Sequence, residues 1–343
     1  MVEAIASEVT MRSPELKGQT VSTIYFGGGT PSVLSTAQLR LLIDKLSDSY
    51  ELSATAEVTL EANPEDINIQ VIDDLLSLGV TRLSMGIQSF DDTVLTSMNR
   101  SHNSDQALNA VRTAQHGGID NISVDIIYGL PGKALAHLTE DVEQFLDLKV
   151  PHISAYALTI EKGTLYHHQV KKGSLVMPTD DMVEQQFFAL RKSLIKAGYE
   201  HYEVSNFAQP GGISKHNSAY WKAVPYLGFG PSAHSYNVST RSWNMANNHG
   251  YMKAVEEGSP SRESETLDQH TRFNEYVLTR LRTKWGLNLT HISNEFGVDI
   301  IKDNEAIWSR YEGRYHIKDG HLILDPEGLI LADGLASDLF QIA

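Results

Sequence analysis

Polar side chains recur at the ends of β-rich runs in the first half of the sequence. Glu61 ends one run, Gln88 ends the next, and Asp125 lies in a third. A carboxylate or amide in such a place accepts hydrogen bonds from the hydroxyls of a ribose. Arg100 adds a guanidinium that can form two parallel hydrogen bonds with a carboxylate. Any one of these residues is equally well explained as a solvated or capping side chain, but their recurrence indicates a shared ligand site.

Three consecutive glycines follow directly on the apolar run VSTIYF, in the string Gly27-Gly28-Gly29-Thr30. Glycine exposes bare backbone, so a ligand can approach its N–H and C=O groups closely. The string is neither a Walker loop nor a dinucleotide fingerprint, because the lysine and the glycine spacing are missing. A tight turn between a strand and a helix explains it equally well.

The string HNSAYW places an imidazole next to two aromatic rings, in a stretch that we expect to be an irregular loop. Its members are His216, Asn217, Tyr220 and Trp221, with Ser218 and Ala219 between them. Imidazole is an axial ligand of haem iron, and aromatic rings stack on porphyrin faces. On the residues alone, a loop pinned by a buried Trp explains the string better than a haem site does.

The order of elements explains how the strand-end groups come together. Short β-rich runs alternate with helical segments near 35–48, 69–78, 104–117 and 134–148. The runs are Val21–Phe26, Glu57–Glu61, Arg82–Gly86, Ile122–Ile127 and His152–Leu158. Such alternation predicts parallel strands joined by right-handed crossovers. Either an open doubly wound sheet or a (β/α) barrel fits, and one polar group per strand end favours the barrel.

The rest of the chain predicts a helix over 178–197 and an irregular binding region over 200–258. From about 267 two helices precede a hairpin that turns at Asp319–Gly320, which resembles a winged-helix module with a packing role. We therefore expect three segments: a barrel over 1–200, a connecting or haem-binding region over 201–260, and an accessory domain over 261–343.

Composition excludes several kinds of site and partner. The net charge is -15, which disfavours binding to nucleic acid or to an anionic membrane surface. No apolar run approaches the roughly 20 residues of a membrane span, so we expect a cytoplasmic protein that is not membrane-integral. The chain has 0 Cys, which excludes disulfides and any Cys-ligated iron–sulfur cluster built from this chain alone.

Seven strings together resemble the radical-SAM coproporphyrinogen oxidase-like family in order and approximate spacing, over essentially the whole chain. They are YFGGGTPSVL, EVTLEANPE, RLSMGIQSF, MNRSH, SVDIIYGLPG, YEVSNFA and LGFGPSAHS. The resemblance implies a partial (β/α)6 TIM-like barrel, here without its first strand, and a C-terminal accessory domain. It also implies that S-adenosylmethionine is bound by family-equivalent positions: the glycine turn (Gly28, Gly29, Thr30), the ribose-binding Glu61, and Gln88, Arg100 and Asp125.

The HNSAYW string is similar to a pattern that marks the haem-chaperone branch of this family. The resemblance implies haem binding through His216, Asn217, Tyr220 and Trp221, with His216 as the ligand of the haem iron, and transfer of haem to acceptor proteins. Two alternatives stay open. One is an oxygen-independent coproporphyrinogen III oxidase, and the other is a lyase-like barrel enzyme using Glu61 and Asp125.

The sequence departs from the family in one large respect. Family members begin with a strand that leads into CxxxCxxC, whose thiolates hold a [4Fe–4S] cluster, and this chain begins beyond that motif. We expect truncation rather than true loss, because the other strings are intact, and we expect no radical enzyme activity from the chain as given. Without the first barrel strand, the run Val21–Phe26 would offer an unpaired edge that could pair with a second copy as a homodimer.

Overall fold

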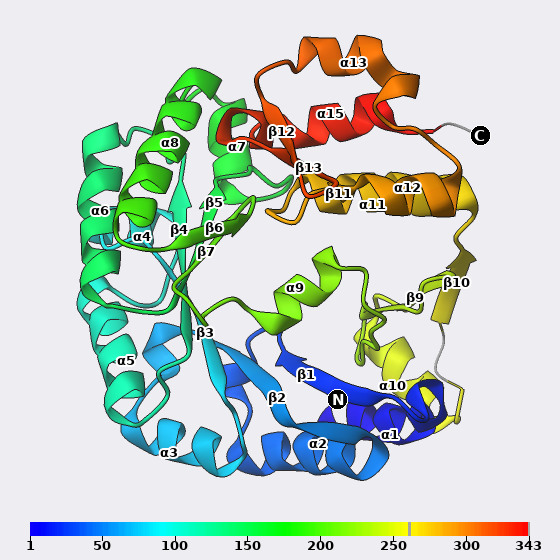
Figure 1. Cartoon of the computed structure of the whole chain (residues 1–343). Helices are drawn as coiled ribbons and strands as arrows, with labels where there is room; N and C mark the ends of the chain where they lie inside the picture. Colours follow the sequence, from blue (N-terminus) through cyan, green and yellow to red (C-terminus); the bar gives the residue numbers. More distant parts are fainter. Residues whose placement is uncertain (260–261, 342–343) are drawn as a thin grey trace. The chain divides into compact units, whose positions relative to one another are not determined.

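The structure is a computed structural model that describes residues 1–259 and 262–341 (Figure 1). The chain divides into two compact units. Unit 1 comprises Met1–Thr23, Thr36–Ala56 and Lys215–Ala343, and unit 2 comprises Ile24–Ser35 and Glu57–Ser214. This division cuts across the three consecutive segments expected from the sequence, which stay a prediction.

A seven-stranded sheet has the strand order β1-β2-β3-β4-β5-β7-β6. Its strands are β1 (Thr20–Phe26), β2 (Glu51–Ala62), β3 (Arg82–Gln88), β4 (Ile122–Tyr128), β5 (His152–Ala157), β6 (Glu200–Glu203) and β7 (Asn206–Ala208). Strands β2 to β5 pair in parallel, and β7 pairs with β5 and β6 antiparallel. The order of β1 to β5 never reverses, so the sheet has no switch point. This is the partial barrel predicted from the sequence, with β1 at one edge; pairing of that edge with a second copy stays a prediction.

Unit 2 encloses its strands with helices. These are α3 (Ile69–Ser77), α4 (Asp92–Ser97), α5 (Ser104–His116), α6 (Leu135–Asp147), α7 (Leu165–Lys171) and α8 (Asp180–Lys196). Figure 1 shows α3, α5, α6 and α8 along the outer side of the strands. Polar N-cap residues precede all of these helices except α6, which follows Ala134. At α5 the side chain of Asn103 accepts from the backbone of Gln106 in a reciprocal capping box. Leu83, Met85 and Val124 are fully buried on one face of the sheet, whereas Ser84 and Gly86, which alternate with them on β3, are only partly buried.

Unit 1 contains two small three-stranded sheets, ordered β10-β9-β8 and β11-β13-β12. Its strands are β8 (His234–Tyr236), β9 (Thr240–Asn244), β10 (Arg262–Thr266), β11 (Leu287–Asn288), β12 (Tyr315–Lys318) and β13 (His321–Leu324). Its helices are α1 (Val2–Met11), α2 (Thr36–Ser49), α9 (Lys215–Trp221), α10 (Asn248–Glu256), α11 (Gln269–Leu281), α12 (Leu289–Phe296), α13 (Glu305–Arg310), α14 (Pro326–Leu329) and α15 (Ala332–Leu339). The hairpin of β12 and β13 turns at Asp319 and Gly320, both with positive φ, as the sequence predicted.

The expectation of an irregular region over 200–258 is wrong. That stretch contains β6, β7, α9, β8, β9 and α10, and the HNSAYW string lies in the helix α9 rather than in a loop. These elements have three to nine residues each, which is too short for a hydrophobic period to be read from the sequence.

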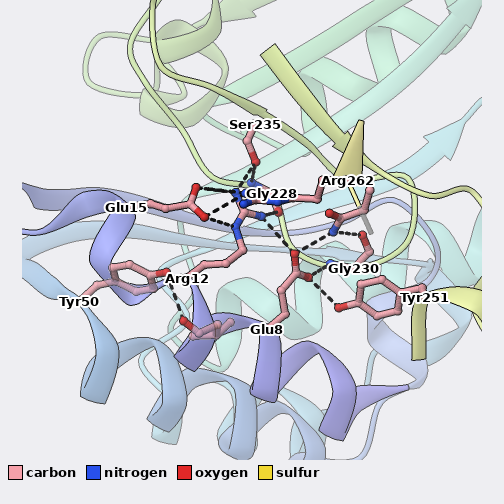
Figure 2. A network of polar contacts seen from close by, with 11 residues as sticks. Glu8, Arg12, Glu15, Tyr50, Gly228, Gly230, Ser235, Tyr251 and Arg262 are labelled. Atoms are coloured by element: carbon pink, nitrogen blue, oxygen red, sulfur yellow. Dashed lines mark hydrogen bonds and ion pairs between the residues drawn. The ribbon is translucent and has the colours of Figure 1, made fainter. Parts of the chain in front are cut away.

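A buried carboxylate anchors α1 to the segment that precedes β8 (Figure 2). Glu8 is 0% exposed and accepts four hydrogen bonds. The donors are Arg12 Nη1 at 3.1 Å, Asn244 Nδ2 at 2.8 Å, the backbone N–H of Gly230 at 2.9 Å and the hydroxyl of Tyr251 at 2.7 Å. A buried charge is tolerated only when it is paired and hydrogen-bonded, and here both conditions are met.

The guanidinium of Arg12 extends this network. It donates to the carbonyl oxygen of Gly228 at 2.7 Å, to Ser235 Oγ at 2.9 Å and to both carboxylate oxygens of Glu15. Glu15 also accepts from Arg262 at 2.9 Å. The charge pairs with Glu15 and Glu8 outweigh burial and raise the pKa of Arg12. The network therefore ties the first helix to the glycine-rich string LGFGPSAHS.

Among residues 1–259 and 262–341, none of the helices combines the length and apolar character that crossing a bilayer requires.

Candidate functional site

The parallel strands of unit 2 bring the two predicted carboxyl groups near each other, with Glu61 next to the end of β2 and Asp125 in the middle of β4. In the parallel register Glu61 lies opposite Ser84, and Asp125 lies opposite Ser154. The carboxyl ends of neighbouring parallel strands meet at the same edge, which is where ligand sites of barrels lie. Glu61 and Asp125 are both partly exposed.

The glycine turn after β1 lies directly against Glu61. A Cβ atom added at Gly27 would lie 2.8 Å from a carboxylate oxygen of Glu61 and 2.5 Å from a ring carbon of Tyr25, so a larger residue would displace these two side chains. Gly28 has a φ of +76°, which other residues rarely adopt. Around Gly28 and Gly29 the space is open, and Thr30 is exposed. The turn therefore offers bare backbone beside a carboxylate.

Tyr25 belongs to this site, although the sequence analysis did not name it. Its hydroxyl donates to Glu61 at 2.7 Å. Burial, and then the negative charge of Glu61, raise the pKa of Tyr25 far above its ordinary value, so the phenol stays protonated. The position of Tyr25, two residues before the glycine turn, was the only signal in the sequence.

Asp125 is held in an environment that favours its neutral form. Removal from water raises the pKa of Asp125 to about 7, and the nearby charge of Glu61 acts in the same direction. A hydrogen bond from Ser154 and the charges of Arg100 and Arg82 oppose this shift only in part. A carboxyl group of this kind changes its charge near neutral pH.

Arg100 and Gln88 complete the group at the end of β3. Arg100 Nη2 donates to the carbonyl oxygen of Gly86 at 2.8 Å and to Asn63 Oδ1 at 3.3 Å. Its Nε is buried with no hydrogen-bond partner among the described residues. Gln88 has a φ of 75° and lies where the register between β3 and β4 shifts. Backbone strain at a non-glycine residue is commonly found at functional sites.

The helix α9 in unit 1 carries the residues of the HNSAYW string, which the sequence predicts to bind haem. His216 Nδ1 lies 2.8 Å from Thr23 Oγ1 on β1, and His216 Nε2 lies 3.1 Å from the hydroxyl of Tyr220. The Tyr220 ring stands edge-on to the imidazole, with ring centres 5.1 Å apart, and is 43% exposed. One turn of helix separates the two residues, which places them on one face. Asn217 follows His216 and is partly buried.

Tyr220 begins a row of neighbouring aromatic rings that does not include Trp221. Tyr226 packs edge-on against Tyr220 with ring centres 4.8 Å apart, and Tyr236 lies 6.1 Å beyond Tyr226. Trp221 instead lies under the guanidinium of Arg282, 5.7 Å away, and its Nε1 is buried without a partner in the described chain. The two aromatic residues of HNSAYW therefore face different surroundings, and only Tyr220 contacts His216.

The donor chemistry of these residues fits some groups and not others. Nitrogen of a neutral imidazole next to an exposed aromatic ring fits haem. Bare glycine backbone, two carboxyl groups and the unpartnered Nε of Arg100 fit a cationic nucleoside such as S-adenosylmethionine. A [4Fe–4S] cluster does not fit, because the chain has 0 Cys. The described part of the chain also has no group of three or more His, Asp or Glu side chains placed to bind a metal ion.

The chain is similar to known proteins over most of its length. Residues 2–145 match the family described as the radical SAM superfamily. The chain is 37% identical to the heme chaperone HemW of Lactococcus lactis, over 81% of this chain and 73% of that protein. It is 34% identical to the heme chaperone HemW of Mycobacterium tuberculosis, over 98% of this chain and 85% of that protein. The solved structure of coproporphyrinogen III oxidase (HemN) from Escherichia coli, a radical SAM enzyme, superposes with a TM-score of 0.83 at 21% identity, covering 99% of this chain and 82% of that one.

Proposed function

This chain belongs to the HemW family of the radical-SAM superfamily, and from that premise we propose that it binds haem and passes it to acceptor proteins. The observation that carries the proposal is the pairing of His216 with the exposed ring of Tyr220 on α9. The cytoplasmic location expected from the sequence is part of this proposal.

His216 would hold the haem iron through Nε2, the nitrogen that faces Tyr220. Bound haem supplies an iron centre that accepts a neutral imidazole as its axial ligand. Thr23 contacts the other ring nitrogen and so keeps the imidazole plane in place. Tyr220 and Tyr226 supply aromatic edges on the same side, while Asn217 and Trp221 support the helix.

Coproporphyrinogen oxidation has less support. The likeness to the Escherichia coli oxidase lies at 21% identity and carries the fold alone. Radical chemistry in that family starts from electrons delivered by a cluster, and this chain supplies no thiolate ligand for one. The lyase alternative stays a prediction, because Glu61 accepts a hydrogen bond from Tyr25 but no observation assigns an acid–base role to that pair.

Haem titration of the purified chain tests the proposal. We expect one equivalent of haemin to produce a Soret band distinct from that of free haemin. Mixing the loaded protein with apomyoglobin should then transfer the haem and produce the spectrum of myoglobin. A titration that yields only the spectrum of free haemin would refute haem binding, and a loaded protein that never releases haem would refute the transfer role.

The strand-end site is proposed to bind S-adenosylmethionine through Gly28, Gly29, Thr30, Glu61, Gln88, Arg100 and Asp125. We expect calorimetry to show binding that strengthens by up to about tenfold from pH 6 to pH 8. The reason is that Asp125, with a pKa of about 7, is neutral below that pH and becomes an anion above it. An anion accepts ribose hydrogen bonds and attracts the sulfonium charge more strongly than a neutral carboxyl group does.

Two variants separate the roles of the carboxylates in this experiment. Asp125→Asn should bind with an affinity that no longer changes between pH 6 and pH 8. Glu61→Gln should bind about tenfold more weakly, and its pH midpoint should move downward, because the charge of Glu61 is one cause of the raised pKa of Asp125. Unchanged affinity in Glu61→Gln would remove Glu61 from the site.

A further inference from the structure

Both ring nitrogens of His216 are occupied by hydroxyl groups from different parts of unit 1. Thr23, which is 193 residues away in the sequence, places its Oγ1 2.8 Å from Nδ1. Tyr220, one helical turn along α9, places its hydroxyl 3.1 Å from Nε2. A neutral imidazole carries one N–H and one lone pair, so one hydroxyl must accept a hydrogen bond and the other must donate one.

The chemistry of the two hydroxyls decides which does which. A phenol is far more acidic than an aliphatic alcohol, and its oxygen lone pair is delocalised into the ring, so Tyr220 is the better donor and the poorer acceptor. Thr23 is then the acceptor for the Nδ1–H bond. This assignment places the proton of His216 on Nδ1 and directs the hydroxyl of Tyr220 at the lone pair of Nε2.

We propose that Thr23 is a positioning residue that fixes the Nδ1–H form of His216, and that the hydroxyl of Tyr220 is a removable cap on Nε2. The inference rests on the proposed haem binding at His216. On binding, the hydrogen bond from Tyr220 to Nε2 breaks and a coordinate bond from Nε2 to iron forms. The proton stays on Nδ1, the phenol keeps its own proton, and its O–H turns to water.

The cap has a consequence for release. The hydroxyl competes with iron for a single lone pair, so it lowers the affinity for haem and returns to Nε2 as haem leaves. Tyr220 is 43% exposed, which leaves its side chain room to turn away from the helix. A protein that must release haem benefits when Nε2 has a bonding partner both with haem bound and after haem has left.

The haem-free protein tests the assignment of the proton. Nitrogen-15 NMR of His216 should show the Nδ1–H form in the wild type. Thr23→Val keeps the β-branched shape but has no hydroxyl, so it should shift the ring toward the Nε2–H form, and Thr23→Ser should restore the wild-type signal. An Nε2–H form in the wild type would overturn the proposal.

Tyr220→Phe tests the cap, because it keeps the ring and removes only the hydroxyl. We expect diethyl pyrocarbonate to modify His216 faster in this variant, with peptide mass spectrometry separating His216 from the other histidines. We also expect haemin to bind about three- to tenfold more tightly, the equivalent of one lost competing hydrogen bond. Slower modification, or equal or weaker haemin binding, would show that the hydroxyl is not a cap.

Different results would refute the haem-binding proposal and the roles of Thr23 and Tyr220. If the wild type binds no haemin, the haem proposal falls, while the NMR and modification results still report on Thr23 and Tyr220. If haemin binds through His216 but Thr23→Val binds as tightly as the wild type, haem binding stands and the positioning role of Thr23 is refuted.

Discussion

His216→Ala is expected to weaken haem binding by more than about a hundredfold and to shift the Soret band. The variant removes the nitrogen on α9 that we propose as the iron ligand, whereas loss of one aromatic contact costs only about 0.5–1.5 kcal/mol. Partners of a ligating histidine alone typically change affinity by roughly 10–100-fold, so loss of the ligand itself should exceed that range. Optical titration with haemin measures both effects.

His234→Ala is the matched control for this variant. His234 is exposed and, like His216, lies beside an aromatic ring; the ring centres of His234 and Trp243 are 6.0 Å apart. It should leave the spectrum and the affinity unchanged. Free imidazole added to His216→Ala should restore the Soret position, because it supplies the missing nitrogen. Wild-type affinity and spectrum in His216→Ala without imidazole would show that the iron ligand lies elsewhere.

Tyr220→Ala should change haem binding much less than His216→Ala does. The variant loses the ring contact, which weakens binding, and it also loses the hydroxyl that occupies Nε2, which strengthens it. The two effects oppose each other, so we expect a net change below about tenfold.

Glu8→Ala is expected to lower the free energy of unfolding of unit 1 by about 3–5 kcal/mol. The substitution removes one acceptor from each of the buried donors Arg12, Asn244 and Tyr251. Figure 2 shows the contacts of Arg12 and Tyr251 with Glu8. Urea unfolding followed by Trp fluorescence is the measurement. All four Trp residues lie in unit 1, so the signal reports on that unit.

Glu257→Ala is the control for the buried pair. Glu257 and Lys253 are also separated by four residues on a helix, but both side chains are more than 60% exposed and their charged atoms are 3.8 Å apart. Exposed pairs of this kind contribute about 0.3–0.5 kcal/mol. The loss of unfolding free energy in Glu8→Gln should lie between those of Glu8→Ala and Glu257→Ala, because the amide keeps the shape but can accept on one atom only. Equal unfolding midpoints for Glu8→Ala and Glu257→Ala would show that the buried network stabilises unit 1 no more than an exposed ion pair does.

Local sequence was enough to predict most of the sheet. The apolar runs of β1 to β5 are long enough to be recognised, and the helices between them require parallel crossovers. That topology places Glu61 next to the carboxyl end of β2, whereas Asp125 lies in the middle of β4. The turn at Asp319–Gly320 was equally local, because two residues with positive φ define it.

The conformation of the helix α9 could not be predicted from its own sequence. It has seven residues, and isolated helices shorter than about 12 residues are marginal in water. Packing against the rest of unit 1 therefore decides its conformation, including the hydrogen bond between Thr23 and His216 and the contact of Trp221 with Arg282. No residue of the HNSAYW string predicts either partner.

By itself the sequence predicted the consecutive parallel strands and the hairpin, and it determined the absence of thiolate ligands. Only the tertiary structure decided that Tyr25 binds Glu61, that Thr23 and Tyr220 share the two nitrogens of His216, and that Glu8 is buried among donors from positions 230 to 251. The physical reason is that periodicity and turn chemistry act between neighbours in the chain. A hydrogen bond across 36 to 243 residues exists only after the elements that carry its two ends have packed.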